Sequence, residues 1–182
     1  MIAISAPDPP PIVRPCATRA ESGLFARRIS PFYRRRSIRA GPLVLIAREY
    51  AALPRSTFRA VPGRPGRYYP QKALLLVRAG SVATLTIPRT ERRHIALTYR
   101  PSDWRIPYAR GYRLADGEAS VTFRACDADE PSFVPGRKRP VGRWTEFNGA
   151  FVVAGARCVT LHVRSGRRVL PVRLSFGAGR CV

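Results

Sequence analysis

Apolar and polar residues alternate along much of the chain after residue 70. A period of two is typical of β-strands that bury one face, because successive side chains point to opposite sides of a sheet. A continuous apolar run at 73–77 is typical of a buried strand, and two further runs cover 143–147 and 150–153. The alternating segments are 82–87, 94–99, 120–125, 158–163 and 168–176.

Short turn sequences separate these segments. Ala79-Gly80 and Ser165-Gly166 each stand between two expected strands. Asn148-Gly149 lies between two apolar runs and predicts a tight hairpin, because a type I′ turn needs positive φ at both central residues. Together the pattern predicts seven or eight short strands and no long helix. This is typical of an all-β antiparallel β-sandwich, immunoglobulin-like or related.

The alternation also predicts which side chains fill the space between the two sheets. The longest gap between strands, residues 100–119, contains Trp104, Tyr108 and Tyr112 and is expected to pack aromatic rings across one end of the sandwich. The expected core includes Leu74, Leu76, Leu85, Ile87, Leu97, Phe123, Val159, Leu161, Val172 and Leu174.

The region before residue 70 lacks this alternation. Residues 1–40 are rich in arginine and proline and are expected to form a disordered, basic tail. Residues 41–69 are expected to be a linker with room for a short helix, and residues 70–182 the sandwich domain. An alternative interpretation takes Arg35-Arg36 and the apolar run 43–47 as a twin-arginine export signal. Arg48 and Glu49 end that run early for such a signal.

The chain is strongly basic, with 33 Lys+Arg against 11 Asp+Glu and a formal net charge of +22. Arginine binds phosphate through its forked guanidinium, so the charge points to polyanions. The arginines are spread along the whole chain, and a GC-rich coding sequence produces the same excess of arginine over lysine without any selected binding surface. The charge predicts weak, nonspecific binding to polyanions, either as a by-product or as the function.

Chemistry-bearing residues are sparse. His94 and His162 fall on the outward side of their expected strands, where neither has the partners that catalysis requires. Asp127, Asp129 and Glu130 form the one acidic group that could act together, and a solvated loop is its simpler interpretation. The sequence therefore predicts no catalytic residues, no cofactor and no metal ion, and no membrane-spanning segment.

The four cysteines are widely separated in the sequence. Cys126 and Cys158 each lie at the end of an expected strand, and a disulfide between them would tie two strands together. Cys181 is the rival partner for either, and Cys16 in the expected tail would be free. Three buried free thiols, as in reduced compartments, are the alternative.

Five strings of the sequence belong together: 70–75, 121–126, 144–153, 157–159 and 175–181. In this order they resemble a group of uncharacterised exported or membrane-anchored all-β proteins from GC-rich actinobacteria. The resemblance covers roughly residues 41–182. It implies an all-β domain and an extracytoplasmic location, but no activity, partner or site residue. The present chain departs from that group by starting with an arginine- and proline-rich segment in place of a hydrophobic one.

Two functional hypotheses follow from the sequence. The first is a non-enzymatic β-sandwich module of the cell envelope or exterior, which acts by surface contact with an unknown ligand. The second is an arginine-rich protein that binds nucleic acids without sequence specificity. An enzyme is the least favoured class, because the constellations that would carry catalysis are missing from the sequence.

Overall fold

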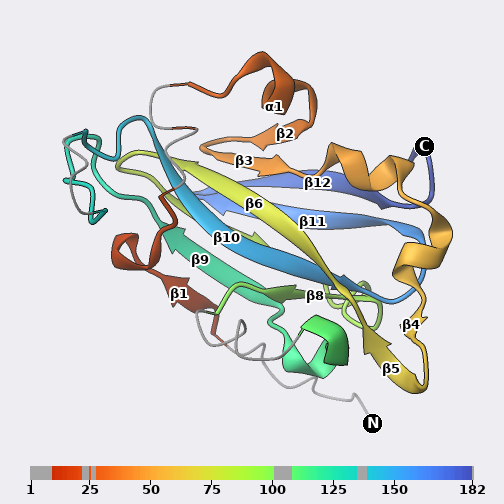
Figure 1. Cartoon of the computed structure of the whole chain (residues 1–182). Helices are drawn as coiled ribbons and strands as arrows, with labels where there is room; N and C mark the ends of the chain where they lie inside the picture. Colours follow the sequence, from red (N-terminus) through yellow and green to blue (C-terminus); the bar gives the residue numbers. More distant parts are fainter. Residues whose placement is uncertain (1–9, 22–24, 26–27, 101–107, 135–138, 182) are drawn as a thin grey trace, which may run out of the picture.

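Strands dominate the computed structural model, which describes residues 10–21, 25, 28–100, 108–134 and 139–181 (Figure 1). The strands are β1 (Ile12–Arg14), β2 (Ser37–Ala40), β3 (Leu43–Ile46), β4 (Ala60–Val61), β5 (Arg64–Tyr68), β6 (Pro70–Arg78), β7 (Val82–Thr86), β8 (Ile95–Thr98), β9 (Ser120–Arg124), β10 (Trp144–Val153), β11 (Arg157–Ser165) and β12 (Arg168–Phe176). The helical segments are η1 (Cys16–Thr18), α1 (Pro31–Arg35), η2 (Arg48–Ala52), η3 (Arg55–Phe58), η5 (Tyr108–Arg110) and η6 (Leu114–Asp116).

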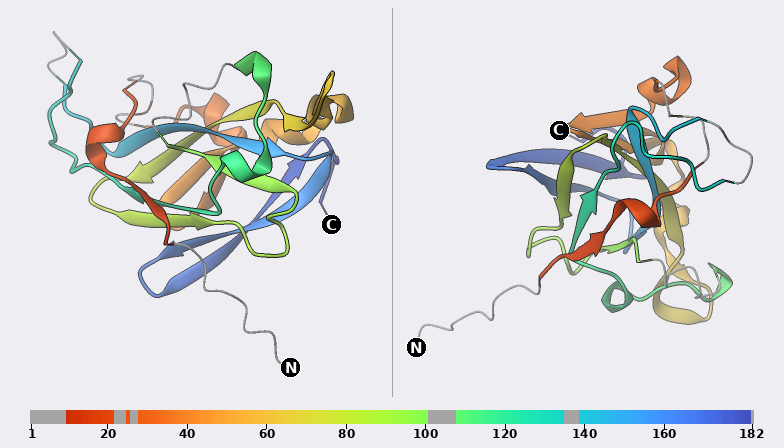
Figure 2. Two further views of the ribbon diagram at one scale, coloured as in Figure 1. Left: turned by 90° about the horizontal axis from the view of Figure 1, so that it is seen from below. Right: turned by 90° about the vertical axis from the view of Figure 1, so that its left-hand side faces the viewer.

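Ten of these strands form two five-stranded sheets. Sheet I has the order β1-β9-β7-β11-β12, and sheet II has the order β2-β3-β6-β10-β8. All neighbours are antiparallel except β1 and β9, which run parallel. Figure 2 shows the arrangement from two further sides. The predicted all-β, mainly antiparallel sandwich is therefore confirmed, and seven of the strands follow residue 70.

The main core lies between the two sheets and is rich in aromatic rings. Tyr99 packs edge-on against Phe123, and Phe123 lies 5.1 Å from Phe147, measured between ring centroids. Eight of the ten expected core residues belong to this cluster: Leu85, Ile87, Leu97, Phe123, Val159, Leu161, Val172 and Leu174.

The other two expected core residues lie on the opposite face of β6. Leu75 and its alternate neighbours face the main core, whereas Leu76 and Leu74 belong to a second cluster on the outer face of sheet II. The expected inward orientation of Leu74 and Leu76 was therefore wrong. The run 73–77 is apolar on both faces, so its sequence carries no alternation that could show which face points inward.

The second cluster exists because the chain before β2 folds over sheet II. Phe25 is fully buried there, and its ring packs against that of Tyr33 at a centroid distance of 4.9 Å. Ser30 caps α1 by accepting a hydrogen bond from the Tyr33 amide. The remaining members are Val44, Ile46, Leu76 and Trp144, with Ile29 and Leu74 at the margin.

The described part of the expected tail is built into the domain. β1 pairs with β9, and β2 pairs with β3. Arg14 is only 4% exposed, and its guanidinium donates hydrogen bonds to the backbone oxygens of Tyr99 and Thr18. The expectation of disorder up to residue 40 is wrong for residues 10–21 and 28–40, and residues 1–9 lie outside the described residues. An arginine that looks solvated in the sequence is buried here because carbonyl groups satisfy its donors.

Residues 41–69 are also part of the domain and not a linker. All four residues of β3 are buried, and β3 lies between β2 and β6 in sheet II. The expected helical turn after residue 48 is present as η2. Pro62 and Gly63 join β4 to β5 in a hairpin, and φ is positive at Gly63 and at Gly66 within β5.

The expected hairpin at Asn148-Gly149 is wrong, because β10 runs through both residues without a break. Its register against β6 is continuous from Trp144 to Val152. A Cβ atom at position 149 would lie 2.1 Å from the nearest ring atom of Tyr99. Glycine is needed here for the close approach of the Tyr99 ring and not for a turn.

Candidate functional site

All four cysteines are paired in the structure, but not as expected. Cys16 bonds to Cys126, and Cys158 bonds to Cys181. The expected Cys126–Cys158 disulfide and the free Cys16 were therefore wrong. Cys181, the rival candidate, is the actual partner of Cys158.

The pairing follows from the strands that carry the cysteines. Cys16 lies two residues after the end of β1, and Cys126 lies two residues after the end of β9. Because β1 and β9 are parallel neighbours, their last residues lie side by side. Their Cα atoms are 4.8 Å apart. Cys158 pairs in register with Ser175 near the end of β12, and Cys181 follows that strand at a Cα distance of 5.8 Å. Both distances lie in the usual range for a disulfide.

The histidines do not form a site together. His162 lies on β11, where it pairs in register with Thr86 and Pro171. His94 precedes β8 and accepts a hydrogen bond from Arg93. Partial burial and the positive charges of Arg157 and Arg93 lower the pKa of His94. The lowered pKa favours the neutral form of the His94 imidazole.

The acidic group at 127–130 lies in the loop after β9. Asp127 and Asp129 are exposed, and Glu130 is half-buried. No group of three or more His, Cys, Asp or Glu residues that could hold a metal ion occurs in the described part of the chain. Of the expected aromatic loop, Tyr112 is buried against Ala96 and Val152, and Trp104 lies outside the described residues.

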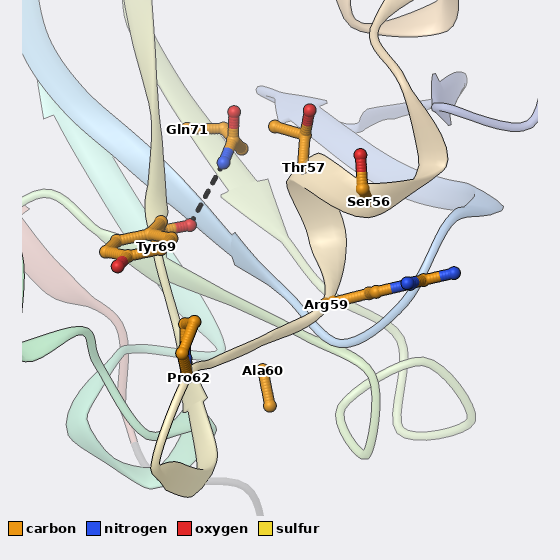
Figure 3. Close-up of a pocket in the computed structure, with 7 residues that line it drawn as sticks. All are labelled: Ser56, Thr57, Arg59, Ala60, Pro62, Tyr69 and Gln71. Atoms are coloured by element: carbon orange, nitrogen blue, oxygen red, sulfur yellow. Dashed lines mark hydrogen bonds between the residues drawn. The ribbon is translucent and has the colours of Figure 1, made fainter.

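Among the hollows lined by described residues, two are similar in size and differ in chemistry. The first has a volume of about 460 Å³ and lies beside η3 and the β4–β5 hairpin (Figure 3). Gln71 is mostly buried there and donates a hydrogen bond to the Tyr69 backbone oxygen. This hollow offers hydroxyl groups and one side-chain amide, with a single arginine that extends away from Tyr69 in Figure 3. Its lining residues are Ser56, Thr57, Arg59, Ala60, Pro62, Tyr69 and Gln71.

The second hollow lies on the outer side of sheet II, at the margin of the segment that covers it. We call it the arginine hollow. It has a volume of about 440 Å³, within the range of ordinary ligand pockets. The described lining residues are Arg28, Ile29, Arg34, Ser37, Arg39, Val44, Arg48, Arg143 and Trp144.

Five arginines from five segments of the chain meet in this hollow. Arg34 comes from α1, Arg39 from β2 and Arg48 from the start of η2. Arg28 precedes α1, and Arg143 precedes β10. The fold therefore brings together arginines as far apart in the sequence as Arg28 and Arg143.

The floor of the arginine hollow is rigid and apolar. Val44 and Trp144 both belong to the outer cluster of sheet II. Arg39 pairs in register with Val44, and its guanidinium carbon lies 5.5 Å from the centroid of the Trp144 ring. The Ser37 hydroxyl donates a hydrogen bond to the Arg34 backbone oxygen. These contacts fix one wall of the hollow before any ligand binds.

Sequence reasoning missed these arginines as a group. Arg34 and Arg39 flank Arg35 and Arg36, which do not line the hollow, whereas Arg48 stands apart from other arginines in the sequence, so no shared local spacing marks the five. Only the pairing of β2 with β3, and the folding of residues 28–36 over sheet II, bring them together. A sequence search for basic runs would have selected Arg34-Arg35-Arg36, of which only Arg34 lines the hollow.

Comparisons with known proteins gave no match. No family model, no curated protein and no solved structure matches this chain. Among the described residues, no helix is long and apolar enough to cross a membrane.

Proposed function

We propose that this chain is a non-enzymatic β-sandwich module that acts outside the reducing interior of the cell, at the envelope or the exterior, by binding through its surface. The observation that carries the proposal is the pairing of all four cysteines in two disulfides. Disulfides persist in oxidising compartments and are rare where glutathione and thioredoxin reduce them. The resemblance to exported all-β proteins of actinobacteria agrees with this location.

The chemistry of the arginine hollow supports binding as the activity. Guanidinium groups hold anions by charge and by forked hydrogen bonds, and they do not act as proton donors or nucleophiles at neutral pH. The indole of Trp144 adds a flat apolar surface. A set of groups of this kind favours the retention of a ligand.

The experiment that tests the proposal is thiol trapping during cell fractionation. Cells that make the protein are lysed in an alkylating reagent, and each fraction is analysed by mass spectrometry before and after reduction. We expect the protein in the envelope or medium fraction, with all four cysteines protected until reduction. Four alkylated cysteines on protein recovered from the cytosolic fraction would contradict the proposal.

A second candidate function is nonspecific binding of nucleic acids. The observation that favours it is the convergence of five arginines beside an aromatic ring, which is the composition of many phosphate-backbone surfaces. Titration of a DNA oligonucleotide at increasing salt tests it. Affinity that falls steeply with salt and is indifferent to sequence supports this function, and a lack of binding at 50 mM salt contradicts it.

A further inference from the structure

We propose that the arginine hollow is a binding site for a compact ligand that carries adjacent phosphate groups. This inference rests on the proposed function as a binding module and names the ligand class of its site. The lining of the hollow is strongly positive. Five of its nine described lining residues are arginines, and none is acidic.

Arginines elsewhere in the described chain are neutralised by carboxylates. Arg19 pairs with Glu21 at 2.7 Å, and Arg67 pairs with Asp116 at 3.9 Å. Next to the hollow, Arg36 points to Glu49, at 3.4 Å, and stacks on Phe32. Within the described residues, no ion pair joins any of the five hollow arginines to a carboxylate.

Without a bound anion, the five arginines of the hollow raise the electrostatic free energy of the protein. Like charges gathered on one concave surface repel one another, and a concave wall focuses their field. A bound anion removes this repulsion and gains charge-assisted hydrogen bonds from the guanidinium forks. The hollow is therefore better suited to a filled state than to an empty one.

Adjacent phosphate groups match the charge of the hollow better than a single phosphate does. A phosphate group carries about two negative charges near neutral pH, so a single phosphate balances less than half of five guanidinium charges. Adjacent phosphates balance more of the charge within one small volume. The forked guanidinium matches the spacing of two phosphate oxygens, and arginine binds phosphate through such bidentate pairs.

The test is the binding of inorganic tripolyphosphate to the purified, disulfide-intact protein, measured by calorimetry in 150 mM NaCl. At this ionic strength charges more than about 8 Å away are largely screened, so binding reports on nearby groups. We expect saturable binding of one tripolyphosphate per chain, and weaker binding of single inorganic phosphate.

Two double variants distinguish the site from the overall charge. The first, Arg34→Gln with Arg143→Gln, removes two charges that two separate segments contribute to the hollow. The matched control, Arg164→Gln with Arg173→Gln, removes the same charge from exposed positions on sheet I. We expect the first pair to weaken tripolyphosphate binding by at least about tenfold, because two charge-assisted contacts are lost, and the control by less than about twofold.

Three outcomes would overturn the inference. Equal weakening by both pairs would assign binding to the diffuse charge, and a lack of saturable binding would remove the site. Tighter binding of a DNA oligonucleotide than of tripolyphosphate, lost in the first pair only, would favour the nucleic-acid function. A failure of this test leaves the proposed location untouched, because location is read from thiol trapping and fractionation.

Discussion

The outer faces of the two sheets differ in polarity and in what covers them. On sheet I, half-buried polar side chains pair across neighbouring strands. The hydroxyl oxygens of Thr84 and Thr122 are 2.8 Å apart, as are those of Thr86 and Ser120. On sheet II, the outer face of β3, β6 and the start of β10 is apolar, and Phe25, Ile29 and Tyr33 cover it. The second face makes a further buried layer, and it carries the arginine hollow at its margin.

This difference explains why the N-terminal part of the chain belongs to the domain. A sheet with one wet face needs only its partner sheet, whereas a sheet with two apolar faces needs a further element to bury the second one. The Cys16–Cys126 disulfide and the pairing of β1 with β9 join residues 12–16 to sheet I. The buried Arg14 guanidinium also donates a hydrogen bond to the backbone oxygen of Tyr99, which follows β8 of sheet II.

The two disulfides are expected to differ in their effect on stability. Cys16 and Cys126 are 110 residues apart in sequence, and Cys158 and Cys181 are 23 apart. In the chain-entropy description, the loss of the longer link costs about 5 kcal/mol and the loss of the shorter about 3.5 kcal/mol. Urea unfolding of the Cys16→Ser/Cys126→Ser and Cys158→Ser/Cys181→Ser variants measures both. A smaller effect for the first pair would show that the N-terminal segment is not tied to sheet I.

Adjacent leucines of β6 test whether the outer face of sheet II is a true core. Leu75 faces the main core and Leu76 the outer cluster, and both are fully buried. Each change to alanine should lower the free energy of unfolding by about 2–5 kcal/mol. Val82→Ala, at a position 50% exposed on sheet I, is the control and should cost less than about 0.5 kcal/mol. A cost for Leu76→Ala as small as that of the control would mean that residues 25–36 do not cover this face.

Gly149→Ala tests the close contact inside the main core. The added methyl group would overlap the ring of Tyr99, so we expect a loss of about 1–3 kcal/mol from overpacking. Gly63→Ala serves as the comparison, because a Cβ atom there meets open space and only the positive φ is unfavourable. That change should cost about 1 kcal/mol. A well-tolerated Gly149→Ala, by thermal denaturation, would contradict the close approach of the Tyr99 ring to position 149.

Acid should loosen the N-terminal segment at Glu21. Burial acts to raise the pKa of the Glu21 carboxyl, but hydrogen bonds from Ser132, Arg19 and the Phe133 amide outweigh it and hold the pKa below its usual value. A lowered pKa in the folded state stabilises the fold above the unfolded-state value, near 4.3, and this contribution is lost as pH falls through the folded-state pKa.

The change Glu21→Gln should cost about 1 kcal/mol at pH 6 and less at pH 3, because the carboxylate is the favoured partner only when ionised. Unfolding curves for the protein and this variant at both pH values measure the difference. A cost that is equal at the two pH values would contradict the role of the Glu21 charge.

The sequence predicts sheet I better than sheet II, for a physical reason. β7, β9, β11 and β12 alternate because their outer faces meet water, and their expected core residues are confirmed. β3 and β6 are apolar on both faces, so the period of two disappears and the orientation of Leu74 and Leu76 was not readable. Gly149 carries a turn signal in the sequence, but its actual role depends on Tyr99, which is distant along the chain.

The candidate site was less predictable than the fold. The pairing of Cys16 with Cys126 depends on β1 lying beside β9, and β1 is a three-residue strand in a proline-rich context. The arginines of the hollow come from separate segments, and no local pattern marks them among 31 arginines, from 33 Lys+Arg less two lysines. Both features are set by long-range pairing of strands, which no local pattern in the sequence encodes.

The most direct test of the account is peptide mapping of the purified protein without reduction, because it asks whether the N-terminal segment is joined to sheet I. Cleavage after arginine and lysine, except where proline follows as at Arg14-Pro15, places the four cysteines in peptides 1–19, 125–137, 158–164 and 181–182. The account predicts that peptide 1–19 is linked to 125–137, and 158–164 to 181–182. A link between 125–137 and 158–164, with a free thiol in peptide 1–19, would contradict it.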